Sequence, residues 1–134
     1  MIVLDASVVL KWVFSEEDGS DRADSLKSDH IAGTEVVAVP DLLFYEIANV
    51  LATKTRLSEK DCKEALSLLW HFDLERFELG LEEFLDAASL ARRYKITLYD
   101  AVYVELAQRL KCVFITADKK LHEKVKGLKM VELL

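Results

Sequence analysis

The stretch MIVLDASVVLKWVF, residues 1–14, indicates the fold class because it holds two different apolar patterns in succession. MIVLD, Met1–Asp5, is a short continuous apolar run, which is typical of a strand buried on both faces. SVVLKWVF, residues 7–14, continues as one or two apolar helical turns. A buried strand that leads directly into a helix is the opening unit of an α/β domain.

The rest of the chain repeats this alternation of short apolar strands and helices. Further strands are predicted over 35–40, which Pro40 ends, and over 76–80, 112–116 and 129–133. Helices are predicted over 41–56 with Asp41 as N-cap, from Ser58 to 72, over 81–94, 98–110 and 117–126, with a short one inside 15–31. The pattern predicts a three-layer α/β/α sandwich around a central, mostly parallel sheet.

Apolar spacing also assigns an inward face to several helices. The predicted inward residues are Ala23, Leu26 and Ile31; then Cys62, Ala65, Leu66, Leu69 and Phe72; then Leu81, Phe84, Leu85, Ala88 and Ala91. LYDAVYVELAQRL, residues 98–110, is apolar on nearly every side and is predicted to be buried.

Length and composition describe a globular chain of one domain, residues 1–134. Hydrophobic residues make up 51%, and there are only four Gly and one Pro. No apolar run approaches the ~20 residues that span a bilayer, and because the sequence enters a strand-like run directly, we expect no signal peptide. Cys62 and Cys112 fall on apolar patterns, so we expect reduced, buried thiols in a cytoplasmic protein.

Four acidic residues occupy positions where an α/β sheet forms a site. Asp5 ends the first strand, and Asp118 follows the strand that ends at Thr116. Sites in open α/β sheets lie beyond the carboxyl ends of strands, so both acids face one crevice if these strands are neighbours. Asp100 opens the buried helix, where a negative charge is favourable. Glu46 lies on a mostly apolar helical stripe, which predicts a partly buried position or the edge of a cleft.

Each acid also has an ordinary structural explanation. Asp5 and Asp118 suit helix caps, Thr97 and Asp100 have the spacing of a capping box, and Glu46 suits a solvated helix position. Capping alone does not require an anion, because Ser, Thr and Asn cap as well as Asp. Several carboxylates in one crevice repel one another unless a cation is bound. Oxygen ligands without His or Cys favour Mg²⁺ or Mn²⁺ over zinc.

Four motifs carry a resemblance to a known family: VLDASV at 3–8, PDLLFYEIANVL at 40–51, LYDAVYVELA at 98–107 and FITADKKL at 114–121. In this order and spacing, the chain resembles a PIN domain, and in particular the VapC-type ribonuclease toxins of prokaryotic toxin–antitoxin pairs. The resemblance implies a parallel sheet in an α/β/α sandwich. It also implies hydrolysis of RNA phosphodiester bonds with Mg²⁺ or Mn²⁺, an RNA substrate, a small antitoxin of the VapB type and a homodimer or higher oligomer.

The resemblance assigns the site residue by residue. The family's acidic quartet, catalytic and metal-binding, maps onto Asp5, Glu46, Asp100 and Asp118, with Asp5 and Asp100 expected as the principal ligands. Ser7 and Thr116 match polar positions that support these ligands, although both also suit helix capping. The RNA sequence that is cleaved does not follow from the resemblance.

The net charge of −6 is unfavourable for RNA binding, so attraction to phosphate has to be local. One divalent ion would change it to −4 and two to −2. The candidate phosphate contacts are Lys11, Lys54, Arg56, Lys119 and Lys120, each of which equally suits a solvated surface. Five large rings are candidates for a dimer interface or for the core: Trp12, Phe14, Tyr45, Trp70 and Phe72.

Other functions remain open at the level of sequence. A non-catalytic PIN-fold binding module would have the same motifs. A Mg-dependent phosphatase would need a second Asp where Ser7 stands, and a receiver-like domain would need an Asp where the second strand ends in Val39-Pro40. The chain contains no phosphate-binding GxxxxGK[ST], no GxGxxG and no GxSxG.

Overall fold

A computed structural model describes residues 1–14 and 21–134, and its centre is a five-stranded sheet. The strands are β1 (Ile2–Leu4), β2 (Val37–Pro40), β3 (Glu75–Phe77), β4 (Val113–Thr116) and β5 (Val131–Leu133). Their spatial order is β3-β2-β1-β4-β5, and every neighbouring pair is parallel. The predicted parallel sheet is confirmed, although β3 begins and ends earlier than the predicted strand over 76–80.

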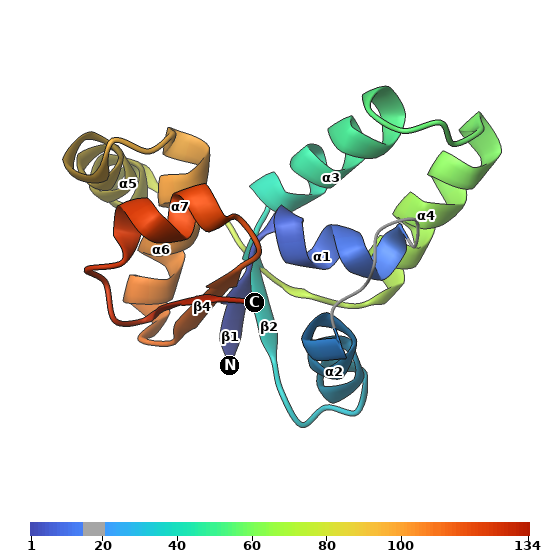
Figure 1. Ribbon diagram of the computed structural model, residues 1–134, viewed down its shortest axis with the longest axis horizontal. Helices are drawn as coiled ribbons and strands as arrows, with labels where there is room; N and C mark the ends of the chain where they lie inside the picture. The colour runs from blue at the N-terminus through green and yellow to red at the C-terminus, as the bar shows by residue number, and fades with distance from the viewer. Residues whose placement is uncertain (15–20) are drawn as a thin grey trace.

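The helices form two layers, one on each face of the sheet. They are α1 (Ala6–Val13), α2 (Asp21–Ile31), α3 (Leu42–Thr53), α4 (Glu59–His71), α5 (Leu81–Tyr94), α6 (Leu98–Leu110) and α7 (Lys119–Val125). Figure 1 shows α1–α4 on one side of the strands and α5–α7 on the other. The chain builds the sheet outward from β1 to β3 and then returns to β4. Right-handed crossovers in these two directions place their helices on opposite faces, so the predicted α/β/α sandwich is confirmed.

The reversal of direction lies between the two central strands. β1 is paired with β2 on one side and with β4 on the other, and Leu4 lies opposite Ile115. Asp5 follows β1 directly, and Asp118 follows β4 after one residue. From the sequence, Asp5 and Asp118 share one crevice only if their strands are neighbours. The pairing of β1 with β4 meets this condition. Their carboxyl ends form the topological switch point at which α/β sheets bind ligands.

The predicted helix faces are confirmed in part. α4 buries Ala65 and Leu69, with Phe72 buried just after its end, and Ala101–Ala107 of α6 are buried throughout. Ile31 is exposed, because it ends α2 at a turn that leaves the core through Gly33, whose φ is +73°. The part of the predicted α2 region at 15–20 lies outside the described residues.

The predicted inward stripe of α5 is wrong except at Ala91, which is half-buried and packs against the core. Leu81, Phe84 and Leu85 are 72%, 49% and 53% exposed, and the helix buries Ala87 and Leu90 instead. Ala88 is exposed too. The physical reason is that α5 packs chiefly against α6 rather than on the sheet, so only a narrow stripe of the helix is covered. An apolar surface is consequently left on its first two turns.

One further expectation needs correction. Asp41 does not cap α3: its backbone is helical and its side chain makes no capping hydrogen bond. Its amide instead donates to the Phe77 carbonyl at 3.2 Å, which holds the residue at the end of the β2–β3 ladder. For Trp12 and Phe72 the sequence left core and interface open, and the structure places both in the core, where the two buried rings meet edge to face at 5.6 Å.

Tyr45 and Trp70, by contrast, are exposed, and Phe14 is half-buried. Cys62 and Cys112 carry free thiols, as predicted, but both residues are half-buried, whereas full burial was expected. Within residues 1–14 and 21–134, none of the helices combines the length and the apolar character that a membrane crossing needs.

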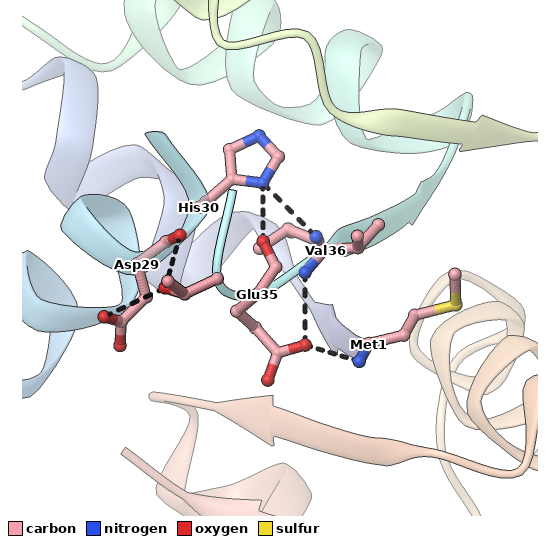
Figure 2. Close-up of polar contacts among 7 residues, drawn as sticks. Met1, Asp29, His30, Glu35 and Val36 are labelled. Atoms are coloured by element: carbon pink, nitrogen blue, oxygen red, sulfur yellow. Dashed lines mark hydrogen bonds and ion pairs between the residues drawn. The ribbon is translucent and has the colours of Figure 1, made fainter. Parts of the chain in front are cut away.

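Polar contacts fix the amino ends of β1 and β2, at the edge of the sheet opposite the switch point (Figure 2). The Met1 ammonium pairs with Glu35 Oε1, which also accepts the Val36 amide at 3.1 Å. His30 Nδ1 lies 3.4 Å from the Glu35 carbonyl oxygen and 3.4 Å from the Val37 amide. These contacts hold β1 and β2 in register from the end that carries none of the four candidate acids.

Candidate active site

Asp5 occupies the junction between β1 and α1. Asp5 is the N-cap of α1, and its Oδ1 accepts the Ser7 amide at 3.0 Å. The predicted capping role is therefore correct, but it accounts for only one of the contacts of this carboxylate. The carboxylate also accepts two hydroxyls, from Ser7 at Oδ1 and from Thr116 at Oδ2, both at 2.5 Å. Burial raises the pKa of Asp5 above its usual 3.8, and these hydrogen bonds lower it without cancelling the effect.

The two hydroxyls tie the ends of β1 and β4 together. Thr116 is fully buried, and its Oγ1 accepts the Asp118 amide at 3.0 Å. Ser7 Oγ accepts the Ala117 amide at 2.8 Å and lies 3.4 Å from Thr116 Oγ1. A simple helix cap would need neither contact. The network fixes the orientation of the Asp5 carboxylate between two strands that are distant in sequence.

Glu46 reaches the same region from α3. It is half-buried, as its place on an apolar stripe predicts, and its Oε1 accepts the Tyr103 hydroxyl at 2.5 Å. Burial raises the pKa of Glu46, the Tyr103 hydrogen bond lowers it, and the charges of Asp5 and Asp100 raise it further. Burial and the same three carboxylates also hold the pKa of Tyr103 well above its usual value. Acids from β1, α3 and α6 therefore lie within electrostatic reach of one another.

Asp100 and Asp118 line one depression at the edge of this cluster, together with Lys120 and Lys124. The Asp100 amide donates to Thr97 Oγ1 at 3.1 Å, which confirms half of the predicted capping box. Asp118 Oδ1 caps α7 by accepting two amides of its first turn at 2.9 and 3.0 Å. The pKa of Asp100 is raised overall, chiefly by burial and also by the negative charge of Asp118. The Thr97 hydrogen bond and the positive charge of Lys124 lower it in part.

The oxygen ligands that the four acids offer are of the kind that hard divalent cations prefer. All four side chains offer carboxylate oxygens, and three of them have raised pKa values, to which like charges contribute at Glu46 and Asp100. A bound cation would offset this repulsion. As the side chains stand, no group of three or more His, Cys, Asp or Glu in residues 1–14 and 21–134 is arranged to hold a metal ion. Cation binding would therefore need these side chains to rearrange.

The candidate basic residues are not gathered in one place. Lys120 lines the depression beside Asp100 and Asp118, and Lys119 precedes it at the exposed start of α7. Lys11 lies in the last turn of α1. Lys54 and Arg56 follow the far end of α3, which leads away from the strands in Figure 1. At 1.5 Å per helical residue, Lys54 lies about 12 Å beyond Glu46 along the axis.

The structure adds two residues to the site that the sequence analysis does not predict, Tyr103 and Lys124. Tyr103 was assigned to the core because its helix is apolar, although its spacing of three residues from Asp100 places both on one helix face. Lys124 lies one helical turn after Lys120, so the same periodicity identifies it. The contact of Tyr103 with Glu46 joins positions 57 residues apart and has no local signal.

Comparison with known proteins identifies the family of this chain. The family model described as PIN domain matches residues 2–127. The chain belongs to the PIN domain family. This PIN domain is 31% identical over 131 residues to ribonuclease VapC3 of Pyrobaculum aerophilum. The aligned region covers 95% of this chain and 96% of VapC3. It is 33% identical over 127 residues to ribonuclease VapC9 of Mycobacterium tuberculosis, with 92% and 90% covered.

Solved structures agree on the fold of this PIN domain. VapBC2 from Rickettsia felis, bound to a DNA fragment from its promoter, superposes with a TM-score of 0.73 at 13% identity and covers 100% of this chain and 99% of that one. A toxin–antitoxin complex from Klebsiella pneumoniae superposes with a TM-score of 0.67 at 18% identity, covering 98% and 96%. The resemblance drawn from the four sequence motifs is confirmed, and it takes precedence over the phosphatase-like and receiver-like alternatives.

Proposed function

We propose that residues 1–134 form a single nuclease domain, a divalent-metal-dependent endoribonuclease that acts as the toxin of a toxin–antitoxin pair. The observation that carries the proposal is the convergence of Asp5, Glu46, Asp100 and Asp118 at the switch point of a PIN fold. Relatives at 31% and 33% identity are named ribonucleases, which supports RNA as the substrate.

In this proposal Asp5 and Asp100 are the principal ligands of Mg²⁺ or Mn²⁺, and Glu46 and Asp118 complete the set directly or through water. When bound, one or two such ions supply Lewis acidity that lowers the pKa of a water and stabilises the attacking and leaving oxygens of an in-line displacement. The four carboxylates would provide the negative charge that attracts these ions, and Glu46 or Asp118 would orient the attacking water.

The remaining side chains have supporting roles. Ser7 and Thr116 hold both oxygens of Asp5 by hydroxyl hydrogen bonds, so the carboxylate cannot rotate freely. Lys120 and Lys124 supply positive charge beside the acids, where an RNA phosphate would approach. Lys11, Lys54, Arg56 and Lys119 are proposed to contact phosphates farther along the RNA. Such local attraction is needed because the chain as a whole carries a charge of −6.

We propose two kinds of protein partner for the toxin. Structural neighbours from Klebsiella pneumoniae and Rickettsia felis are complexes with an antitoxin, which supports a small antitoxin of the VapB type. A second copy of the chain is proposed to cover the apolar surface of α5. Phe84 there lines a depression together with Tyr45, Leu98 and Tyr99, all of them exposed. Exposed apolar side chains gathered in this way are typical of an interface. Two free thiols are in keeping with a cytoplasmic location.

Substitution of the two principal acids tests the nuclease proposal. Asn accepts a capping hydrogen bond about as well as Asp but is not an anionic ligand. We expect Asp5→Asn and Asp100→Asn to abolish calorimetric Mn²⁺ binding and RNA cleavage while thermal melts show a folded protein. The wild type should cleave RNA with Mn²⁺ and stop when a chelator is added. Undiminished Mn²⁺ binding in both variants would contradict the proposed site, and a wild type that binds Mn²⁺ without cleaving RNA would favour the non-catalytic module.

A further inference from the structure

Tyr103 links the two helical layers at the candidate active site. It lies in the second turn of α6 and is 1% exposed, and its hydroxyl donates to Glu46 of α3 at 2.5 Å. Figure 1 shows α6 and α3 on opposite sides of the strands. The hydrogen bond therefore passes over the carboxyl ends of the central strands, where Asp5 and Asp118 lie.

The position of the Tyr103 hydroxyl is fixed by packing. Its ring stacks on Phe114 of β4, with centroids 5.9 Å apart and planes at 13°. The N-cap bond from Thr97 sets where α6 begins, and Asp100 and Tyr103 follow on one face of that helix. A fully buried ring held between a helix and a strand has few alternative rotamers.

Glu46, in contrast, has little else to hold it. Its long side chain has several rotatable bonds, and the charges of Asp5 and Asp100 both repel it. In the described part of the chain the Tyr103 hydroxyl makes the sole hydrogen bond to the Glu46 carboxylate, and no ion pair reaches that group. Removing this donor would leave the carboxylate free to turn away from the other acids toward water.

We propose that Tyr103 is a positioning residue for metal binding: its hydroxyl fixes one oxygen of Glu46 and thereby directs the carboxylate toward the site formed by Asp5 and Asp100. The inference rests on the proposed nuclease function. A purely structural explanation also exists, in which Glu46 only satisfies a buried tyrosine hydroxyl. The two explanations differ in what happens to metal binding when the hydroxyl is removed.

The test compares Tyr103→Phe with a matched control. Tyr103→Phe keeps the ring and its stacking on Phe114 but removes the hydroxyl. Tyr94→Phe in α5 removes a hydroxyl that makes no hydrogen bond to any residue in 1–14 or 21–134. We expect Tyr103→Phe to weaken Mn²⁺ binding in calorimetry by about 10- to 100-fold, the range for residues that orient a ligand. The kcat for RNA cleavage should fall while the KM for RNA stays constant, since Tyr103 is buried. Tyr94→Phe should match the wild type.

A double variant separates an effect through Glu46 from a general loss of stability. If Tyr103 acts through Glu46, Tyr103→Phe should cause no further loss of Mn²⁺ affinity in a Glu46→Gln background. Wild-type Mn²⁺ affinity in Tyr103→Phe, with only the melting temperature changed, would overturn the inference alone, provided that Asp5→Asn abolishes binding. Equal losses from Tyr103→Phe in both backgrounds would also overturn it. Failure of the wild type to bind Mn²⁺ would overturn the proposed function together with this inference.

Discussion

Thr116→Val removes the hydroxyl that joins the ends of β1 and β4 without changing the shape of the side chain. In the fully buried Thr116, this hydroxyl donates to Asp5 Oδ2 at 2.5 Å and accepts the Asp118 amide at 3.0 Å. A hydrogen bond to a charged group contributes about 1.5–3 kcal/mol, and an amide left without an acceptor costs about 1 kcal/mol. We therefore expect the free energy of unfolding to fall by about 3 kcal/mol.

Thr116→Ser is the matched control, because it keeps the hydroxyl and loses one methyl group, at a cost of about 1 kcal/mol. Urea unfolding at neutral pH with a chelator present should thus separate the Val and Ser variants by about 2 kcal/mol. In thermal melts this difference corresponds to roughly 6–10 °C for a chain of this length. Both variants change the same position, so the difference between them reports the two hydrogen bonds less the contribution of the methyl group that Ser lacks.

The pH dependence of this difference provides the stricter test. The Thr116 hydroxyl stabilises the ionised form of Asp5, and burial holds the pKa of folded Asp5 above 3.8. The penalty should therefore shrink as pH falls through this raised folded pKa, and it should be smallest below 3.8, where the carboxyl is protonated in both folded and unfolded chains. A Val variant as stable as the Ser variant at neutral pH, or a gap that does not change in acid, would refute the reasoning.

Two further predictions concern the acids and the apolar surface. Burial raises the pKa values of Asp5, Glu46 and Asp100. The native state thus binds protons more tightly than the unfolded state. Without divalent ions, the free energy of unfolding therefore falls as pH rises from the usual pKa values, 3.8 for Asp and 4.5 for Glu, through the higher pKa values of the folded state. Asp5→Asn should therefore gain stability relative to the wild type as pH rises through this window in urea unfolding, and a relative loss would contradict the raised pKa. Leu85→Glu should convert a dimer to a monomer in light scattering with an unchanged melting temperature. The control Ile31→Glu, at a residue that is also exposed but lies on α2, should leave the dimer intact. A wild type that is monomeric at micromolar concentration would contradict the interface.

Local patterns in the sequence determined most of the elements and their caps. Continuous apolar runs predicted the strands because both faces of a parallel sheet are covered. Ser58 and Thr97 were found as helix starts since an N-cap depends on residues three positions apart, and their side chains accept the amides of Asp61 and Asp100. Asp5, Asp100 and Asp118 could be nominated in the same way, from their places at strand and helix ends, and Glu46 could be nominated from its place on an apolar helical stripe.

Tertiary structure alone decided which of these local features meet. The pairing of β1 with β4 brings Asp5 to Thr116 across 111 residues, and only that pairing makes a capping aspartate a member of a buried network. Packing of α5 against α6 rather than on the sheet left Leu85 exposed, although its spacing is that of a core residue. Tyr103 was indistinguishable from an ordinary buried ring until its hydroxyl was seen to reach Glu46 from the opposite layer. Helical periodicity specifies which residues share a face, but the element that covers that face depends on strand order and on contacts between distant segments.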